Sequence, residues 1–301
     1  MANKIILGLI LLMVVVPNAF ISYADEFESV VIKTIKITDN VYMLQGRGGN
    51  IGVIAGEDGV LMIDDQFAPL SDKIKTAISN ISDRPIRFVI NTHWHRDHSE
   101  GNENFARAGT IIVAHENTRK RMNTEQFVKA FNKKVLPSPK EALPVVTFSS
   151  DIKFHINGEE IEVIHIQNAH TDGNAVIYFK NSNVIHMGDT YFAGKYPFID
   201  YSSGGGITGV VAGLQKVFAM IDDDTKIIPG HGNLSNKQEL GIYLDMLRDA
   251  KSGTEKFVKE GKTLQELLDS DLLKNHEQRF GQGFLKRDKF LSIVYAGISG
   301  N

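Results

Sequence analysis

The stretch Thr92-His93-Trp94-His95-Arg96-Asp97-His98-Ser99 follows directly after the apolar run 86–91, a pattern typical of a buried strand. Three imidazoles and one carboxylate, all potential metal ligands, fall between His93 and His98. A turn after a strand can direct His93 and His95 to one point, and Asp97 and His98 to a neighbouring point. Clusters of this kind are usually metal sites, although histidines can also satisfy one another in a polar turn. The stretch therefore predicts a metal centre at the end of a strand.

Three later segments each place one further ligand type just past an apolar run. They are 169–174 with His170, 187–190 with Asp189, and 229–232 with His231. Loops at strand ends commonly build the sites of layered α/β folds. Taken singly, such a histidine is more often solvated, but glycines beside all three residues permit tight turns close to a bound object.

The amino-acid composition excludes several classes of protein. The chain has 301 residues, of which 42% are hydrophobic and 23% charged, which excludes a disordered chain, a fibrous repeat and a polytopic membrane protein. The 33 basic and 36 acidic residues give a net charge of −3, so we expect a small-molecule substrate and no nucleic-acid partner. Cysteine is absent, which excludes disulfides, thiolate nucleophiles and cysteine metal ligands.

The N-terminus has the three-part pattern of a secretory signal peptide. Lys4 precedes the apolar run 5–16, Pro17 ends that run, and Ser22-Tyr23-Ala24 resembles a cleavage site before Asp25. The run is short for a bilayer span, which takes about 20 residues, although an uncleaved anchor is the alternative. We therefore expect a signal peptide over 1–24 and a catalytic domain over 25–301. The mature protein is expected to be periplasmic or secreted, with no stable membrane association.

The apolar runs predict two similar halves. In the first half, a β-meander is followed by further strands and helices, with one long helix over 116–131. In the second half we expect strands, a helix over 209–221, and amphipathic helices from about 234 to the end. The predicted fold is α/β: two mostly antiparallel sheets, face to face between helical layers, in one domain with a helical C-terminal segment. The expected strands are 30–37, 41–44, 51–55, 60–63, 86–91 and 110–114 in the first half, and 145–148, 151–156, 161–166, 175–179, 183–187 and 226–229 in the second.

Together these motifs resemble the metallo-β-lactamase superfamily, whose signature is His-x-His-x-Asp-His followed by a later His, a Gly-Asp and a Gly-His. All four match in order over residues 93–231. The resemblance implies an αββα four-layer sandwich that binds metal. By the same resemblance, one metal would be held by His93, His95 and His170, the second by Asp97, His98 and His231, and Asp189 would bridge both.

The donor set agrees with a catalytic centre. A closed structural zinc site takes four protein ligands, whereas seven ligands without cysteine suit two catalytic ions about 3.5–4 Å apart. Imidazole and carboxylate favour two Zn²⁺ ions, with iron or manganese as alternatives. A hydroxide bridging two such ions would have its pKa lowered to about 7 and could attack a carbonyl at neutral pH. Asp97 is the expected catalytic residue, orienting this nucleophile and accepting its proton.

The substrate class stays open between several members of the family. Asp189 stands where true β-lactamases carry cysteine or serine, and a bridging aspartate is typical of glyoxalase II-like thioesterases and phosphodiesterases. We expect a secreted hydrolase of an amide, lactam, lactone or thioester bond, with β-lactamase activity included. The alternatives are a glyoxalase II-like thioesterase and an oxidoreductase resembling the persulfide dioxygenases, which use a single iron. A binding protein that has lost catalysis is disfavoured by the intact ligand set, and a nuclease by the charge.

Other side chains are candidates for supporting roles. Trp94, Tyr191 and Lys195 are predicted to contact substrate, although the spacing of Lys195 from Asp189 departs from that of the lactamase lysine. Asp64 or Asp65 could orient a ligand histidine. Phe67, Phe192 and Tyr196 could line a pocket mouth, with ordinary core or surface positions as the alternative. The remaining histidines are expected to be structural, and they are His115, His155, His165, His186 and His276.

Overall fold

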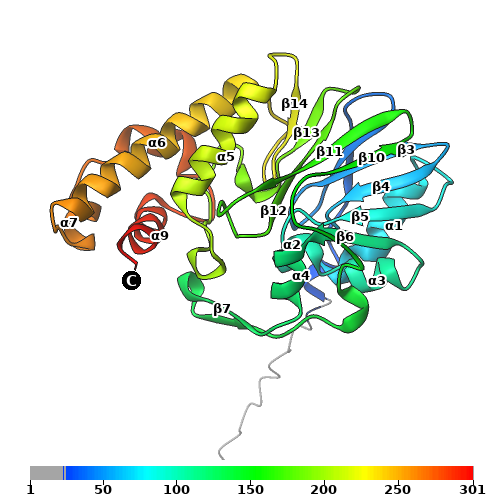
Figure 1. Cartoon of the computed structure of the whole chain (residues 1–301), viewed down its shortest axis with the longest axis horizontal. Helices are drawn as coiled ribbons and strands as arrows, with labels where there is room; N and C mark the ends of the chain where they lie inside the picture. Colours follow the sequence, from blue (N-terminus) through cyan, green and yellow to red (C-terminus); the bar gives the residue numbers. More distant parts are fainter. Residues whose placement is uncertain (1–22, 24, 301) are drawn as a thin grey trace, which may run out of the picture.

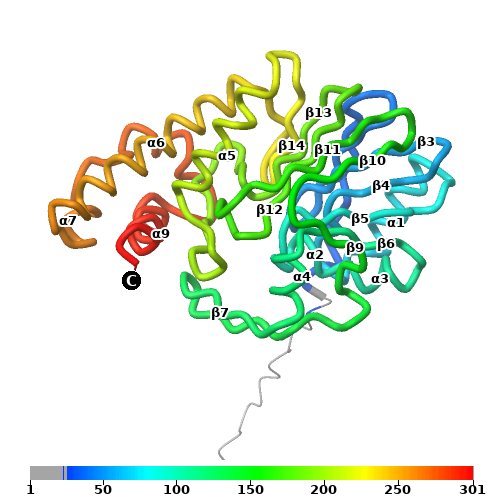
Figure 2. The backbone as a smooth tube through the Cα atoms, viewed as in Figure 1, coloured from blue at the N-terminus to red at the C-terminus, as the bar shows by residue number. Residues whose placement is uncertain are grey.

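Two β-sheets lie face to face between outer layers of helices (Figure 1; Figure 2). The computed structural model describes Tyr23 and residues 25–300, so the predicted leader lies outside the described residues except for Tyr23. The predicted αββα sandwich with a helical C-terminal segment is confirmed. Among the described residues, no helix combines the length and the apolar character that crossing a membrane requires.

The first sheet has seven strands in the order β1-β2-β3-β4-β5-β6-β9. Strands β1 to β4 form the predicted antiparallel meander, whereas β4–β5, β5–β6 and β6–β9 pair in parallel. The prediction of a mostly antiparallel sheet was therefore wrong here, because crossover connections carrying helices link β4 to β5 and β5 to β6. The strands are β1 (Lys33–Lys36), β2 (Val41–Gln45), β3 (Ile51–Gly56), β4 (Gly59–Ile63), β5 (Ile86–Ile90), β6 (Ile111–His115) and β9 (Val146–Phe148).

The second sheet has five strands in the order β10-β11-β12-β13-β14. All pairings are antiparallel except β13–β14, which is parallel because helix α5 (Ile207–Met220) crosses over between those two strands. β9, which the sequence placed in this half, instead extends the first sheet beside β6. The strands are β10 (Ile152–Ile156), β11 (Glu159–Ile166), β12 (Asn174–Phe179), β13 (Val184–His186) and β14 (Lys226–Ile228).

Successive side chains of each strand point to opposite faces of its sheet, so the hydrophobic core is divided into separate layers. In β4, Leu61 and Ile63 belong to the cluster between the sheets, while Val60 and Met62 belong to the cluster beneath α1 and α3. A third cluster fills the space between the outer face of the second sheet and the C-terminal helices. The helices other than α5 are α1 (Ser71–Ser79), α2 (Arg96–Ser99), α3 (Asn102–Ala106), α4 (Glu116–Met122), α6 (Lys237–Lys259), α7 (Leu264–Asp269), α8 (Glu277–Phe280) and α9 (Arg287–Ser299).

The predicted helix over 116–131 was wrong beyond its first two turns. Helix α4 ends at Met122, and the chain then forms an antiparallel hairpin of β7 (Gln126–Val128) and β8 (Lys133–Val135). A 3-10 turn and Asn132, at a left-handed φ of 50°, connect the two strands. Asparagine tolerates this conformation, which would end an α-helix at that point. We call residues 126–135 the β7–β8 hairpin.

Candidate metal centre

The seven predicted ligands come from loops of both sheets and meet at one end of the sandwich. The loop after β5 carries His93 and His95, and helix α2, which follows it directly, carries Asp97 and His98. His170 lies between β11 and β12. Asp189 lies in a 3-10 turn after β13, and His231 follows β14. The turn before Asp189 needs glycine, because Gly188 has a φ of 47° and an added Cβ would lie 2.7 Å from the Thr92 Cβ.

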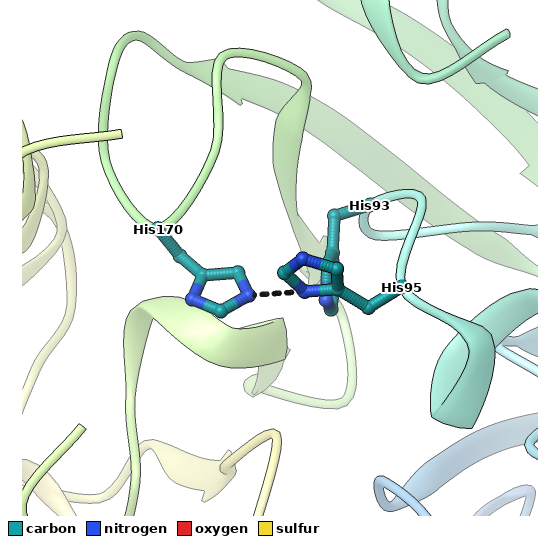
Figure 3. Close-up of side chains that lie close together, drawn as sticks. All are labelled: His93, His95 and His170. Carbon is teal, nitrogen blue, oxygen red and sulfur yellow. Dashed lines mark hydrogen bonds between the residues drawn. The ribbon is translucent and has the colours of Figure 1, made fainter. Parts of the chain in front are cut away.

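His93, His95 and His170 form the first triad. Each offers a ring nitrogen, and the three nitrogens lie within 4.8 Å of one another. The closest pair is His95 Nδ1 and His170 Nε2, at 2.8 Å (Figure 3). The view shows His170 pointing from its loop toward His95 and His93 on the opposite loop. These nitrogens can therefore share one cation.

Asp97, His98 and His231 form the second triad, whose ligand atoms also lie within 4.8 Å of one another. The Asp97 Oδ2 atom lies 3.3 Å from His231 Nε2 and 3.7 Å from His98 Nε2. His98 is fully buried, whereas the side chain of Asp97 is 30% exposed. The second triad thus has one carboxylate with access to solvent.

Asp189 lies between the triads and directs one carboxylate oxygen to each. Its Oδ2 atom lies 3.6 Å from His170 Nε2 and 3.9 Å from His93 Nε2 in the first triad. Its Oδ1 atom lies 3.0 Å from His98 Nε2 and 3.4 Å from His231 Nε2 in the second. Asp189 is 5% exposed, so it is a nearly buried charge surrounded by four imidazoles. A carboxylate in this position can bridge two cations.

The protonation states of the first triad and of Asp189 favour cation binding. Burial lowers the pKa of His93 well below its usual range and that of His170 to about 4, so both rings are neutral ligands at pH 7. Burial opposes the charge of Asp189, but His98 and His231 outweigh it and hold the pKa of Asp189 well below its usual range. Within the described part of the chain, the buried Nε2 atom of His93 has no hydrogen-bond partner. A divalent ion with nitrogen and oxygen ligands fits this donor set.

The family model of the metallo-beta-lactamase superfamily matches residues 44–232. That range covers more than half of the chain and includes both triads and Asp189. The chain belongs to the metallo-β-lactamase superfamily. The predicted resemblance is thereby confirmed, and within this superfamily the His and Asp groups described above mark a divalent-metal site.

Two curated relatives share part of the sequence. The 2,4-dinitroanisole O-demethylase subunit alpha of Nocardioides sp. is 31% identical over 144 residues, which cover 47% of this chain and 40% of the demethylase subunit. The alkyl/aryl-sulfatase BDS1 of Saccharomyces cerevisiae is 36% identical over 69 residues, covering 22% of this chain and 11% of the sulfatase. The chain therefore spans less than half the length of these relatives.

Solved structures of the superfamily share the fold. A metallo-beta-lactamase from Pontibacter korlensis has a TM-score of 0.59 at 21% identity, over 72% of this chain and 99% of its own. The DIM-1 metallo-beta-lactamase has a TM-score of 0.60 at 16% identity, over 73% and 99%. A double mutant of the sec-alkyl sulfatase PisA1 has a TM-score of 0.65 at 15% identity, over 91% of this chain and 51% of its own. These likenesses show the fold.

Carboxylates outside the triads hold two of the histidines in place. Of the two aspartates predicted for this role, Asp64 contacts His98, with Oδ2 2.7 Å from Nδ1. Thr92 donates to both oxygens of Asp64, whose φ of 63° is left-handed. Asp65 instead accepts a hydrogen bond from the Gly101 amide, and burial raises its pKa well above the usual range.

Asp200 contacts a histidine of the first triad in the way that Asp64 contacts His98 of the second. It was not among the residues predicted from the sequence. Its Oδ2 atom lies 3.1 Å from His95 Nε2, and the hydroxyls of Ser202 and Ser203 donate to its carboxylate. Burial opposes its charge, but the contact with His95 outweighs burial and keeps the pKa of Asp200 low. Its sequence neighbourhood, Asp-Tyr-Ser-Ser, has the composition of an ordinary turn, so only its tertiary position marks it.

We expect Asp200→Ala to weaken zinc binding at the first triad by about 10- to 100-fold, because His95 loses the partner that orients its ring. Competition with a chromogenic chelator measures this change, and Asp200→Asn, which keeps the shape, should lose less. Asp151→Asn removes an exposed carboxylate that lies outside both triads and is the matched control. Equal zinc affinity in Asp200→Ala and the wild type would contradict the assignment.

A cavity of about 530 Å³ opens onto the two triads. Of the three residues predicted to contact substrate, Trp94 and Lys195 line this cavity and Tyr191 does not. The Tyr191 ring is buried against Tyr243, at 4.9 Å between centroids, and its hydroxyl bonds with that of Ser235, so the prediction of a substrate contact was wrong. Tyr243 belongs to helix α6, so the Tyr191 ring packs against this helix in the core and does not face the cavity.

Other aromatic residues replace Tyr191 in the cavity wall. Phe67 and Phe192 line the cavity, whereas Tyr196 is buried and stacks on Phe290. The wall also includes side chains that the sequence analysis did not single out, and these are Phe131, Lys133, Phe198 and Phe284. His115 and His165 stack on each other, with ring centroids 3.8 Å apart, and belong to neither triad.

Proposed function

We propose that the protein is a hydrolase that binds two Zn²⁺ ions, one at each triad. The observation that carries the proposal is the position of Asp189, whose two oxygens face different triads. The complete second triad of Asp97, His98 and His231 supports a second ion beside the first. The absence of thiolate ligands, together with the imidazole and carboxylate donors, favours zinc over softer ions.

Bound zinc would supply Lewis-acid activation of a water molecule and of the electrophile. The chain's own contribution is position and proton transfer. Asp97 lines the cavity, and its pKa is held below the usual range by His98 and by a hydrogen bond from His231, against the effect of burial. It is therefore ionised at neutral pH and can orient a water and accept its proton. Trp94 and Phe192 add apolar surface to the wall of the same cavity.

The proposed substrates are small molecules with a lactam, lactone, thioester or other ester bond. A bridging aspartate supports the thioesterase and ester-cleaving alternatives over β-lactams. The names of the two curated relatives, an O-demethylase subunit and an alkyl/aryl-sulfatase, support bonds from oxygen to an aryl or alkyl group. We also propose that the protein is exported to the periplasm or secreted, on the signal-peptide pattern of residues 1–24, and that it binds no nucleic acid.

Metal analysis combined with a hydrolysis panel tests this function. The zinc-loaded protein should contain about two Zn²⁺ ions per chain. It should also cleave at least one member of a panel of β-lactams, homoserine lactones, S-lactoylglutathione, aryl esters and sulfate esters. His93→Ala should lose both metal and turnover, whereas His155→Ala, at an exposed position on β10, should lose neither. One iron per chain with oxidation of persulfides would instead support the dioxygenase alternative and refute the proposal.

A further inference from the structure

A line of aromatic rings leads from the first triad to the protein surface. The Phe198 ring lies 5.6 Å from that of His170 and 5.7 Å from that of His95, between centroids. Phe131 follows at 4.8 Å from Phe198, and Phe284 at 6.2 Å from Phe131. All three phenylalanines line the cavity, and we call them the aromatic wall. The wall gives the cavity one continuous apolar side.

The aromatic wall is assembled from parts of the chain that are far apart in sequence. Phe198 precedes the turn at Asp200, Phe131 lies in the β7–β8 hairpin, and Phe284 lies between α8 and α9. Phe131 is 42% exposed and Phe284 67% exposed. Single exposed apolar side chains are common, but neighbouring ones that continue a cavity wall mark a binding surface. The wall thus provides a surface for an extended apolar group.

Positive charge is available beside the two outer rings. Four cationic side chains line the cavity, but Arg47 pairs with Glu26 and Arg96 pairs with Glu100. Lys133 and Lys195 have no ion-pair partner among the residues that the structure describes.

These two lysines are placed close to Phe131 and Phe284. Lys133 comes two residues after Phe131. The stem of Lys195 packs on Gly283, the residue before Phe284, where an added Cβ would lie 3.0 Å from the Lys195 Cβ. The acidic residues that line the cavity are Asp97 and Asp189 at the metal end and Glu26, which is paired. Unpaired positive charge therefore flanks the outer end of the wall.

We propose that the substrate is an anionic amphiphile. Its aryl or alkyl body lies along the aromatic wall, and its anionic group lies beside Lys133 and Lys195 at the outer end. The opposite end of the molecule then reaches the two triads. This binding mode rests on the proposed function only for the bond that is cleaved, because no residue of the wall and neither lysine is itself one of the seven candidate metal ligands.

Equilibrium dialysis of the full-length protein against 6-phenylhexane-1-sulfonate tests the binding mode. The neutral 6-phenylhexan-1-ol and the small methanesulfonate are the comparison probes. The wild type should bind the sulfonate about tenfold more tightly than the alcohol, because only the sulfonate gains from the lysines. Lys133→Glu with Lys195→Glu should remove this difference and leave binding of the alcohol unchanged. Phe131→Ser should weaken binding of both phenyl probes about tenfold, because an apolar contact is lost.

The same hairpin supplies matched controls. Lys134 pairs with Glu125 and does not line the cavity, so Lys134→Glu should bind the sulfonate as the wild type does. Phe127 is 52% exposed and also lies outside the cavity lining, so Phe127→Ser should behave likewise. Trp94 is the chain's single tryptophan and lines the cavity, so bound sulfonate should change its fluorescence.

Several results would overturn the proposal. They are absence of sulfonate binding, equal affinity for sulfonate and alcohol, full binding by the double lysine variant, or binding that leaves Trp94 emission unchanged. Failure of the proposed function looks different: the protein would hold no zinc and cleave no ester, yet still bind the sulfonate in the lysine-dependent way. A zinc-loaded, active protein that fails the dialysis test would refute the binding mode alone.

Discussion

Replacing Asp189 with asparagine should lower kcat/KM by about a thousandfold or more. Asp189 is the carboxylate that faces both triads, and it places a negative charge among four surrounding imidazoles. Asparagine keeps the shape, but it is neutral and presents an amide donor group in place of one of the two oxygen acceptors. Metal content should fall below two ions per chain. Steady-state kinetics and elemental analysis of the same preparation measure both effects.

An exposed aspartate provides the control for this substitution. The side chain of Asp83 is 97% exposed and lies outside the triads, so Asp83→Asn should keep full metal content and activity. Circular dichroism should show the same secondary structure in both variants. An Asp189→Asn protein that keeps two cations and more than about a tenth of the activity would contradict the bridging role.

Gly49→Ala should disable the centre without changing any ligand. A Cβ on Gly49 would lie 2.1 Å from Cε1 and 2.4 Å from Nε2 of His98, closer than real side chains approach. The ring is fully buried and bonded to Asp64, so it has little room to retreat. We expect about a hundredfold loss of activity, because small misplacements of reacting groups have effects of this size. The free energy of unfolding should also fall, by about 1–3 kcal/mol.

Gly297→Ala is the matched comparison. This glycine lies within α9, where an added Cβ would meet only the Tyr201 Cβ at 3.6 Å, an ordinary contact. Alanine is the better helix former, so the free energy of unfolding should stay equal or rise by up to about 1 kcal/mol. Urea denaturation and activity assays of both variants make the comparison. Equal activity in Gly49→Ala and Gly297→Ala would show that His98 can move without consequence.

The ligands themselves were predictable because their signal is local. Four of them lie within six consecutive residues, and the sequence places each of the other three after an apolar run with glycine close by. Strand ends of a layered fold converge, so these loops could be expected to meet. The two sheets and the helical C-terminal segment were predictable for the same reason. Apolar residues repeat every two residues in a strand and about every 3.6 residues in a helix, and this pattern is visible within each run.

Features that depend on tertiary placement were not predictable in this way. Asp200 lies in a polar turn, and its contact with His95 exists only because separate loops meet. Residues 126–131 of the β7–β8 hairpin were predicted as helix, and the four-residue spacing of Phe127 and Phe131 is also compatible with one helix face. That error hid Phe131 and Lys133 from the list of candidate cavity residues. Gly49 looked like an ordinary turn glycine, because nothing near it in sequence reveals a histidine ring.

Each triad combines candidate ligands from both sheets, so metal binding should affect the stability of the protein during purification and storage. The first triad joins the loop after β5, in the first sheet, to His170 from the second sheet. The second triad joins helix α2, which follows that loop, to His231 after β14. An ion bound at either triad would connect the two sheets. Because such an ion binds the folded state and not the unfolded chain, it would raise the melting temperature of the protein. Stripping with a chelator during purification should therefore lower shelf life as well as turnover, and adding the ion before heating should protect the chain.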